Sequence, residues 1–319
     1  MRAIVLGRRR QDAPTVLDAS LEGARATAES ALQDNSPVVR AMGLIVVGEA
    51  EVLRVAMGHA SQQLVDQRRA LEALQAAGPP PEVARRVPWP VAHGRAGLGS
   101  WSLEIRVPGS PTSAMPTGRL LADCVEFLVA LHGAAAPAGA DGQSLVRDAE
   151  IFATVCSSPR KREVRALAKH LEHELADLPR GFGHGDFWGG NLLAESERLV
   201  GVVDWAAAAP SRLPLLDLLH LHVSAKRWAT NGPLGPALID DFLPWSRSGG
   251  GGDDVREYCL RLGLELMDRK LEALVIAYWL DRVAYELTMF RDRATSSWVD
   301  TNVTAVLDAV LSHGYGVAR

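Results

Sequence analysis

Apolar and polar positions follow a strand-like pattern in the first third of the chain. Residues 44–56 form two β-rich apolar runs on either side of Gly48, which predicts a hairpin. Leucines at helical spacing then predict a helix over residues 61–77, followed at once by a glycine–proline run that ends it. Two more short strands are expected at residues 90–93 and 101–107, separated by a glycine-rich turn.

The pattern becomes helical further along the chain. Apolar residues fall on one buried helix face at Leu121, Val125, Leu128 and His132. Another helix is expected over residues 161–178, and several more after residue 215. The glycine-rich segment 248–254 interrupts these last helices and is typical of a surface loop.

These elements predict an α+β fold with two lobes of different character. Pro108 and Gly109 punctuate the chain where the strands give way to helices. We therefore expect a small β-rich N-terminal lobe over residues 1–107 and a larger, mostly helical C-terminal lobe over residues 108–319.

Composition and charge narrow the class of protein without naming a function. Of the 319 residues, 47% are hydrophobic and 23% are charged, and the net charge is −4, which gives no electrostatic reason to expect nucleic acid or a membrane as partner. The most apolar helical stretch, residues 271–290, carries four charged side chains and does not predict a membrane span. Three widely separated cysteines, and an N-terminus without the order of a signal peptide, indicate a cytoplasmic protein.

The stretch that carries chemistry lies between residues 184 and 205. It reads His-Gly-Asp-Phe-Trp-Gly-Gly-Asn over residues 184–191, and an apolar run then ends in Asp204-Trp205. The candidate groups are thus the carboxylates of Asp186 and Asp204 and the amide of Asn191. Each residue alone is an ordinary turn residue, and it is their joint occurrence in this order that indicates a site.

Phosphoryl transfer needs this set of side chains. The transferring group passes through a loose transition state, so the protein mainly positions the reactants and neutralises charge. One carboxylate orients the attacking hydroxyl and accepts its proton. A second carboxylate and a neutral amide oxygen suit Mg²⁺, because hard cations take oxygen ligands.

The motif resembles the aminoglycoside phosphotransferase family, small-molecule kinases with a protein-kinase-like fold. The resemblance rests on HGDFWGGNLL, VGVVDW and a downstream Leu-Leu-Asp-Leu-Leu. It implies that Asp186 is the catalytic base and that His184 braces the catalytic loop. It also implies that Asn191 and Asp204 hold Mg²⁺, and that Asp217 anchors the loop from the following helix.

The same resemblance implies where ATP or GTP binds. The family's phosphate-binding lysine would stand in the strand around Arg54, and because no lysine precedes Lys161, Arg54 is the expected replacement. The inter-lobe hinge, whose backbone meets the nucleotide base, is expected at Leu103, Glu104, Ile105 and Arg106.

Two parts of the family's phosphate site are not evident in the sequence. A carboxylate from the following helix should pair with Arg54, and the candidates are Asp66 and Glu72, although Gln67 aligns best. No glycine-rich phosphate loop is recognisable, and the turn from Gly43 to Gly48 is its nearest substitute.

Three interpretations of the motif remain open. The first is an active kinase that uses Mg²⁺ and ATP or GTP to phosphorylate a sugar, an aminoglycoside-like antibiotic, in which case it confers resistance, or another metabolite. The second is a degenerate kinase fold acting as a nucleotide-binding or scaffold protein, which the replacement by Arg54 favours. A protein kinase is disfavoured because no Ala-Pro-Glu segment follows Asp204-Trp205.

The acceptor and the oligomeric state are not readable from the sequence. If the acceptor is a polycation, we expect acidic groups of the helical lobe to bind it. The available carboxylates are Asp240, Asp241, Asp253, Asp254, Glu257, Asp281 and Glu286. The histidines His132, His220 and His222 and most tryptophans lie on apolar patterns, so we expect them to be packed.

Overall fold

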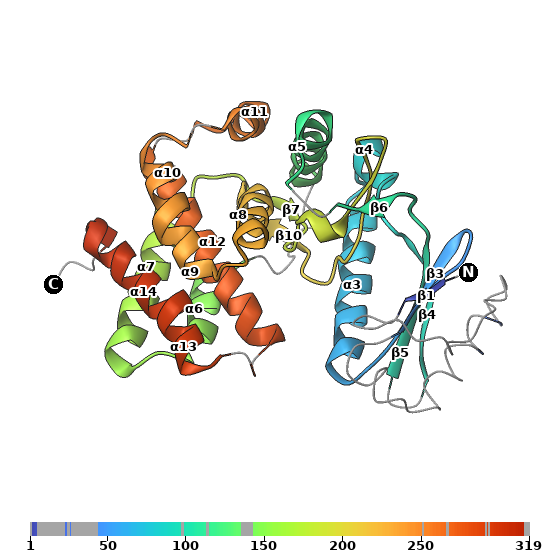
Figure 1. The fold of residues 1–319 in the computed structure, drawn as a ribbon, viewed down its shortest axis with the longest axis horizontal. Helices are drawn as coiled ribbons and strands as arrows, with labels where there is room; N and C mark the ends of the chain where they lie inside the picture. Colours follow the sequence, from blue (N-terminus) through green and yellow to red (C-terminus); the bar gives the residue numbers. More distant parts are fainter. Residues whose placement is uncertain are drawn as a thin grey trace. The chain divides into compact units, whose positions relative to one another are not determined.

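The chain divides into two compact units that are each described separately. The computed structural model describes residues 2–4, 23, 26, 44–96, 99–112, 115–134, 143–250, 252–265, 268–290, 292 and 294–315 (Figure 1). The first unit comprises Met1–Pro111, His184–Asp186 and Asn191–Ala208, and the second comprises Thr112–Gly183, Phe187–Gly190 and Ala209–Arg319. Both units therefore include part of the 184–191 motif.

An antiparallel sheet forms the centre of the first unit. Its strands are β1 (Arg2–Ile4), β2 (Leu44–Val47), β3 (Glu51–Met57), β4 (Pro90–Ala96) and β5 (Gly99–Ile105). They lie in the order β1-β2-β3-β5-β4, so β3 is central. The hairpin expected around Gly48 is confirmed by the pairing of β2 with β3, and both later strands are confirmed as β4 and β5.

The helix α3 (Gly58–Ala76) packs against β3 and β5 of this sheet. Leu71 and Leu74 are fully buried, as the helical spacing of the leucines predicted. The helix ends because Gly78 takes a left-handed φ of 65°, which glycine adopts without strain. Pro81 then opens the short helix α4 (Pro81–Ala84) at a position where a missing N–H is harmless.

A second, smaller sheet completes the first unit, and only part of it was predicted from the sequence. It contains β6 (Ser110–Pro111), β8 (Leu192–Glu195) and β9 (Arg198–Val202), in the order β6-β8-β9. The turn between β8 and β9 places Ser196 and Glu197 at φ values of 49° and 59°, the backbone of a tight hairpin turn. This hairpin carries the chain from Asn191 to Asp204.

The second unit is built mainly from helices. They are α5 (Gly118–His132), α6 (Leu145–Ala153), α7 (Ser158–Glu174), α8 (Leu216–Thr230), α9 (Leu234–Pro236), η2 (Ala237–Phe242), α10 (Leu243–Arg247), α11 (Asp253–Arg261), α12 (Asp268–Met289), α13 (Ser296–Val299), η4 (Asp300–Thr304), α14 (Ala305–Val310) and η5 (Leu311–Tyr315). A two-stranded ladder of β7 (Gly181–Gly183) and β10 (Ala209–Arg212) joins them. Together with the first unit, they confirm the expected α+β class.

Helix α12 is the central element of the second unit and contacts α6, α7, α8 and α10. Two of its carboxylates form ion pairs within the unit. Asp281 binds Arg212 at 2.7 Å, and Glu286 binds Arg227 at 3.2 Å. No helix among the described residues combines the length and the apolar composition that a membrane crossing needs.

A buried charged network links α6, α12 and β10. Arg212 and Gln143 both donate to the carboxylate of Asp281, at 2.7 and 2.9 Å. Asp148 lies beside this pair, and its Oδ2 is buried without a hydrogen-bond partner among the described residues. Burial, reinforced by the charge of Asp281, raises the pKa of Asp148 to about 7.

The substitution Asp148→Asn tests this network. The folded protein holds a proton on Asp148 that the unfolded chain releases above an ordinary pKa of 3.8, so Asp148 makes stability fall as pH rises from about 4 to about 7. We expect Asp148→Asn to remove this fall and to raise the free energy of unfolding at pH 8 by about 1 kcal/mol or more. Urea unfolding at several pH values measures it.

The control is Glu150→Gln on the same helix, where the carboxylate is exposed and pairs with Arg165. That variant should keep the fall in stability between about pH 5 and pH 7, because the lowered pKa of Glu150 affects stability only at more acidic pH. A flat wild-type profile over this range would contradict the assignment.

Candidate functional site

His184 is the buried support of the motif in the first unit. Its side chain is inaccessible to solvent, and the ring packs edge-on to Trp205 at 4.7 Å. Its Nδ1 accepts a hydrogen bond from the Asp186 N–H at 3.2 Å, so Nε2 carries the proton and donates to the Val203 carbonyl at 3.1 Å. The imidazole thus ties the loop at Asp186 to the end of β9.

Asn191 connects Asp186 to the residue before Asp204. Its Nδ2 donates to the Asp186 carbonyl at 2.9 Å and to the Asp186 carboxylate at 3.1 Å. Its own carbonyl accepts a hydrogen bond from the Val203 N–H at 2.9 Å. The structure therefore brings Asp186, Asn191 and the peptide that precedes Asp204 into one hydrogen-bonded group.

Asp204 follows β9 in a strained backbone conformation. Its φ is 65°, in the left-handed region that residues other than glycine seldom adopt. Strain of this kind persists where the surroundings fix it, and it is common at functional sites. Asp204 lines a small cavity of about 70 Å³ together with Arg54 and Gln67, so a carboxylate and a cation face the same space within the first unit.

The oxygen atoms of this group suit a hard divalent cation. Because the Asn191 nitrogen makes both bonds to Asp186, its amide oxygen is the atom left for a metal. With one carboxylate from Asp204, this gives an oxygen donor set of the type that Mg²⁺ accepts, with phosphate and water oxygens filling the other positions. Among the described residues, no group of three or more His, Cys, Asp or Glu side chains is placed to hold a metal ion.

Gly185 explains why the motif has glycine between His184 and Asp186. Its φ is 78°, and a Cβ at this position would lie 2.2 Å from the Ala207 carbonyl oxygen. No other residue fits without a shift of the backbone. An arginine, as in the protein-kinase motif, is therefore incompatible with this loop.

The carboxylate that pairs with Arg54 was predicted wrongly. We expected it on the helix after β3, at Asp66 or Glu72, but the partner is Glu104 on β5, 3.3 Å from Arg54 Nε. The helix position that aligned best, Gln67, contributes an amide that donates to Glu104 Oε1 at 2.6 Å. The helix therefore reaches the ion pair through a hydrogen bond.

Burial dominates the electrostatics of Glu104. The side chain is 2% exposed, and this burial raises its pKa even though Arg54 and hydrogen bonds from Ser102 and Gln67 oppose the shift. Among the described residues Arg54 pairs with Glu104 through Nε, and its terminal nitrogens carry the rest of the guanidinium's positive charge. They remain available for an anion in the cavity beside Asp204.

The remaining first-unit predictions concern the hinge and the phosphate loop. Leu103 is buried in the sheet, and the N–H groups of Ile105 and Arg106 already donate to the carbonyls of Trp89 and Ala50. The nucleotide-binding role of Leu103, Glu104, Ile105 and Arg106 stays a prediction. Gly43 lies outside the described residues, and Gly48 donates to the Glu51 carbonyl within the turn between β2 and β3.

Asp217 lies in the second unit, in the first turn of α8. A Cβ built on Gly183 would come within 3.1 Å of its carboxylate, so Asp217 lies beside the strand that leads directly into His184. This position fits the predicted anchoring role, which stays a prediction. His132 and His220 are buried as expected, whereas His222 is only half-buried and lines a large cavity.

Comparison with known proteins identifies the family to which the chain belongs. The sequence profile of the phosphotransferase enzyme family matches residues 45–256, which include the whole motif. The chain therefore belongs to the phosphotransferase enzyme family, and it is a small-molecule phosphotransferase. A search of curated proteins found no match.

Solved structures with the same kinase-like fold are aminoglycoside phosphotransferases. The GDP complex of aminoglycoside 2'-phosphotransferase-IIIa has a TM-score of 0.53 and 16% identity, covering 91% of this chain and 98% of its own. Aminoglycoside phosphotransferase APH(3'')-Id from Streptomyces rimosus gives 0.51 and 16%, with coverage of 82% and 98%. A thermostable mutant of APH(4)-Ia gives 0.52 and 18%, with coverage of 86% and 91%. Identities this low show a shared fold.

The glycine of the motif provides a test of the loop. We expect Gly185→Ala to lower the free energy of unfolding by about 1–3 kcal/mol beyond the cost of its positive φ, because the new methyl group meets the Ala207 carbonyl. Urea unfolding measures the loss. The matched control is Gly58→Ala, where φ is 58° and a Cβ meets nothing within 4 Å. Equal losses in both variants would show that the loop tolerates a side chain.

Proposed function

We propose that this protein transfers the γ-phosphoryl group of ATP or GTP to a hydroxyl group of a small molecule. The observation that carries the proposal is the hydrogen-bonded group in which Asn191 joins Asp186 to the peptide before Asp204. One side of this group holds a base, and the other holds a metal ligand that shares a cavity with Arg54. These are the parts that phosphoryl transfer requires.

In this mechanism Asp186 orients the acceptor hydroxyl and takes its proton. The acceptor oxygen forms a bond to the γ-phosphorus while the bond from that phosphorus to the β–γ bridging oxygen breaks, and the nucleoside diphosphate leaves with the electron pair. The hydrogen bond from Asn191 holds the Asp186 carboxylate in one orientation. His184 fixes the backbone of the same residue.

Asn191 and Asp204 are the residues that would hold Mg²⁺ beside the phosphates. When bound, the cation neutralises charge on the phosphate oxygens and aligns them for in-line transfer. Arg54 adds a second positive charge on the wall of the cavity that Asp204 lines. The ion pair with Glu104 keeps the Arg54 side chain in place, so its terminal nitrogens meet the phosphate oxygens without further ordering.

The ligands of the fold relatives support a nucleotide donor and a hydroxylated acceptor. One relative was solved with GDP, and another was solved as a ternary complex with ADP and hygromycin B. The donor base therefore stays open between adenine and guanine. We also propose that the reaction takes place in the cytoplasm, which agrees with the three free cysteines Cys124, Cys156 and Cys259.

Substitution of the two carboxylates separates their roles. We expect Asp186→Asn to lower kcat by at least about 100-fold while nucleotide affinity stays within about twofold, because Asp186 serves the acceptor. Asp204→Asn should abolish transfer and also weaken Mg²⁺-dependent binding of a fluorescent ATP analogue. Coupled detection of nucleoside diphosphate release measures the first, and fluorescence titration with and without Mg²⁺ measures the second.

The control for both variants is Asp66→Asn, which removes an exposed carboxylate of α3. It should behave as the wild type. A wild-type protein that binds no Mg²⁺-nucleotide would overturn the proposal.

The ion pair between Arg54 and Glu104 gives a second test. We expect Arg54→Ala to weaken nucleotide binding at least tenfold, and Glu104→Gln to weaken it several-fold, because the amide keeps the hydrogen bonds but not the charge that holds Arg54. Fluorescence titration with the same ATP analogue measures both. Glu72→Gln is the matched control, since Glu72 pairs with Arg68 and with no other described residue, on the exposed side of α3. If Glu72→Gln weakened nucleotide binding and Glu104→Gln left it unchanged, the functional partner of Arg54 would be the helix carboxylate and not Glu104.

A further inference from the structure

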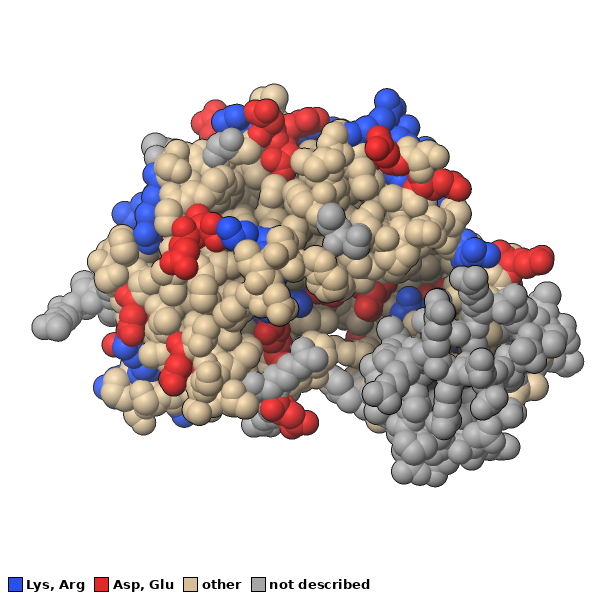
Figure 2. All heavy atoms as spheres, viewed as in Figure 1, with Lys and Arg blue, Asp and Glu red and all other residues tan. Residues whose placement is uncertain are grey.

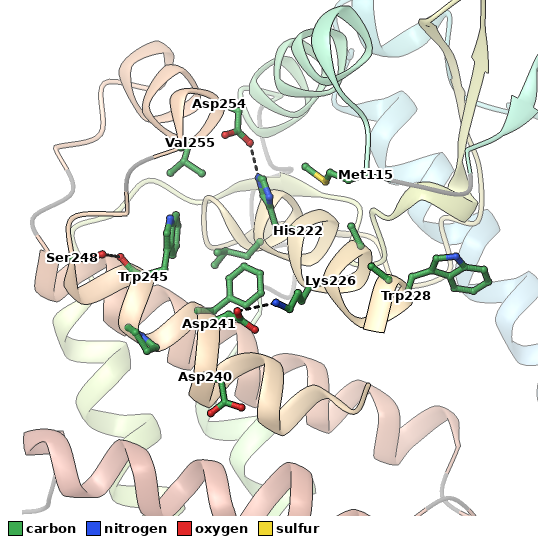
Figure 3. Close-up of a pocket in the computed structure, with 16 residues that line it drawn as sticks. Met115, His222, Lys226, Trp228, Asp240, Asp241, Trp245, Ser248, Asp254 and Val255 are labelled. Atoms are coloured by element: carbon green, nitrogen blue, oxygen red, sulfur yellow. Dashed lines mark hydrogen bonds and ion pairs between the residues drawn. The ribbon is translucent and has the colours of Figure 1, made fainter. Parts of the chain in front are cut away.

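The second unit contains a large cavity that none of the residues of the 184–205 motif lines. Its volume is about 1180 Å³, and it lies between α8, η2, α10 and the start of α11. The space-filling view shows this face of the helical unit hollowed and mostly uncharged (Figure 2). The apolar side chains that dominate its wall include Met115, Trp228, Phe242, Trp245 and Val255 (Figure 3). A concave, mostly apolar cavity of this size is typical of a site for a small organic ligand.

The cavity is linked to the catalytic motif by a contact within the second unit. Trp188 stands two residues after Asp186 in the sequence, and its ring lies 6.3 Å from that of Trp228. Trp228 in turn lines the cavity, although 67% of its surface is exposed. Trp228 therefore joins the cavity wall to Trp188 of the motif within the second unit.

Two of the carboxylates on the cavity wall are paired with neighbouring side chains. Lys226 binds Asp241 at 2.9 Å, and His222 binds Asp254 at 2.6 Å, as Figure 3 shows. Burial disfavours the charged form of Asp254, but the hydrogen bond and charge of His222 outweigh it and lower its pKa. Asp240 is the remaining lining carboxylate, and it is exposed.

The other acidic residues that a polycation would need are also paired. Ion pairs join Asp253 to Arg256, Glu257 to Arg261, Asp281 to Arg212 and Glu286 to Arg227. Of the carboxylates expected to attract a cationic acceptor, Asp240 alone makes no ion pair with a described residue. The wall thus lacks the concentration of uncompensated negative charge that binds several amines at once.

We propose that this cavity binds the phosphoryl acceptor, and that the acceptor is a hydroxylated, ring-bearing molecule that is largely apolar and carries at most one positive charge. The assignment rests on the proposed phosphotransferase function and narrows its substrate class. Aromatic side chains bind flat apolar rings by stacking and by burial of area. A polycation gains little here, because it would have to displace Lys226 and His222 from their carboxylates.

A neutral fluorescent probe tests the cavity without any reaction. We expect N-phenyl-1-naphthylamine to bind the full-length protein with increased fluorescence, and Trp228→Ala and Trp245→Leu each to weaken binding at least fivefold. Trp228→Ala is the safer variant, because so much of that side chain is exposed. The control Trp298→Ala changes a tryptophan of α13 outside the cavity and should leave binding unchanged. Unchanged binding in both cavity variants would overturn the assignment of this site.

A matched pair of lysine variants tests whether the paired carboxylates of the cavity exclude a polycation. Kanamycin, a polycation, should fail to displace the probe from the wild type. Lys226→Met frees the Asp241 carboxylate and should raise the affinity for kanamycin several-fold, whereas Lys270→Met breaks the pair between Lys270 and Asp177 away from the cavity and should have no effect. Competitive displacement by micromolar kanamycin in the wild type would overturn the proposed substrate class.

Turnover separates this inference from the function on which it rests. With Mg²⁺ and ATP or GTP, nucleoside diphosphate release should be stimulated by neutral ring-bearing alcohols that displace the probe and not by aminoglycosides. Stimulation by aminoglycosides would refute the substrate class but leave the phosphotransferase function standing. Failure to bind Mg²⁺-nucleotide would refute that function, whereas the probe and kanamycin results would still report on the cavity.

Discussion

The hydrogen bonds of one residue, Asn191, hold the candidate site together. Its side-chain nitrogen donates to both the carbonyl and the carboxylate of Asp186, and its backbone carbonyl accepts the N–H of Val203. The amide is 93% buried from solvent, so losing one of these partners would leave a polar group unsatisfied. The tight β8–β9 hairpin returns the chain to this point, and Gly185 allows the loop to pass beneath the Ala207 carbonyl. The proposed base and the proposed metal ligand are thereby positioned by the same bonds.

The ion pair between Arg54 and Glu104, which we propose lies beside the phosphates, depends on the register of the sheet. Arg54 lies directly across from Ser102, so Glu104, two residues further along β5, is its diagonal neighbour on the same face. A long side chain spans that distance, and the ion pair forms within the sheet. The helix then contributes only the amide of Gln67. Burying a carboxylate here is costly, as its raised pKa indicates, and this is tolerated because Arg54, Ser102 and Gln67 surround it.

Long periodic elements and the joint motif could be predicted from the sequence, whereas pairings across the fold could not. Helices α3, α5 and α7 and the hairpin of β2 and β3 follow from local spacing, and so did the order of Asp186, Asn191 and Asp204. The ladder of β7 and β10 has three and four residues per strand, too few for a period to register, and it is stable only through tertiary contacts. The partner of Arg54 was missed for the same reason, since register is a property of the sheet.

The two units depend on the sequence in different ways. The motif is a set of neighbours along the chain, so a family can retain it while most other positions change, and identities of 16–18% are compatible with one fold. The cavity of the second unit is lined by side chains of α8, η2, α10 and α11, which belong to no short motif, and its chemistry changes whenever one lining residue changes. Lys226 illustrates this, because one lysine on α8 cancels the charge of Asp241 on another element. The phosphotransferase reaction is therefore a property of the family, whereas the acceptor class that we propose depends on this chain's own cavity wall.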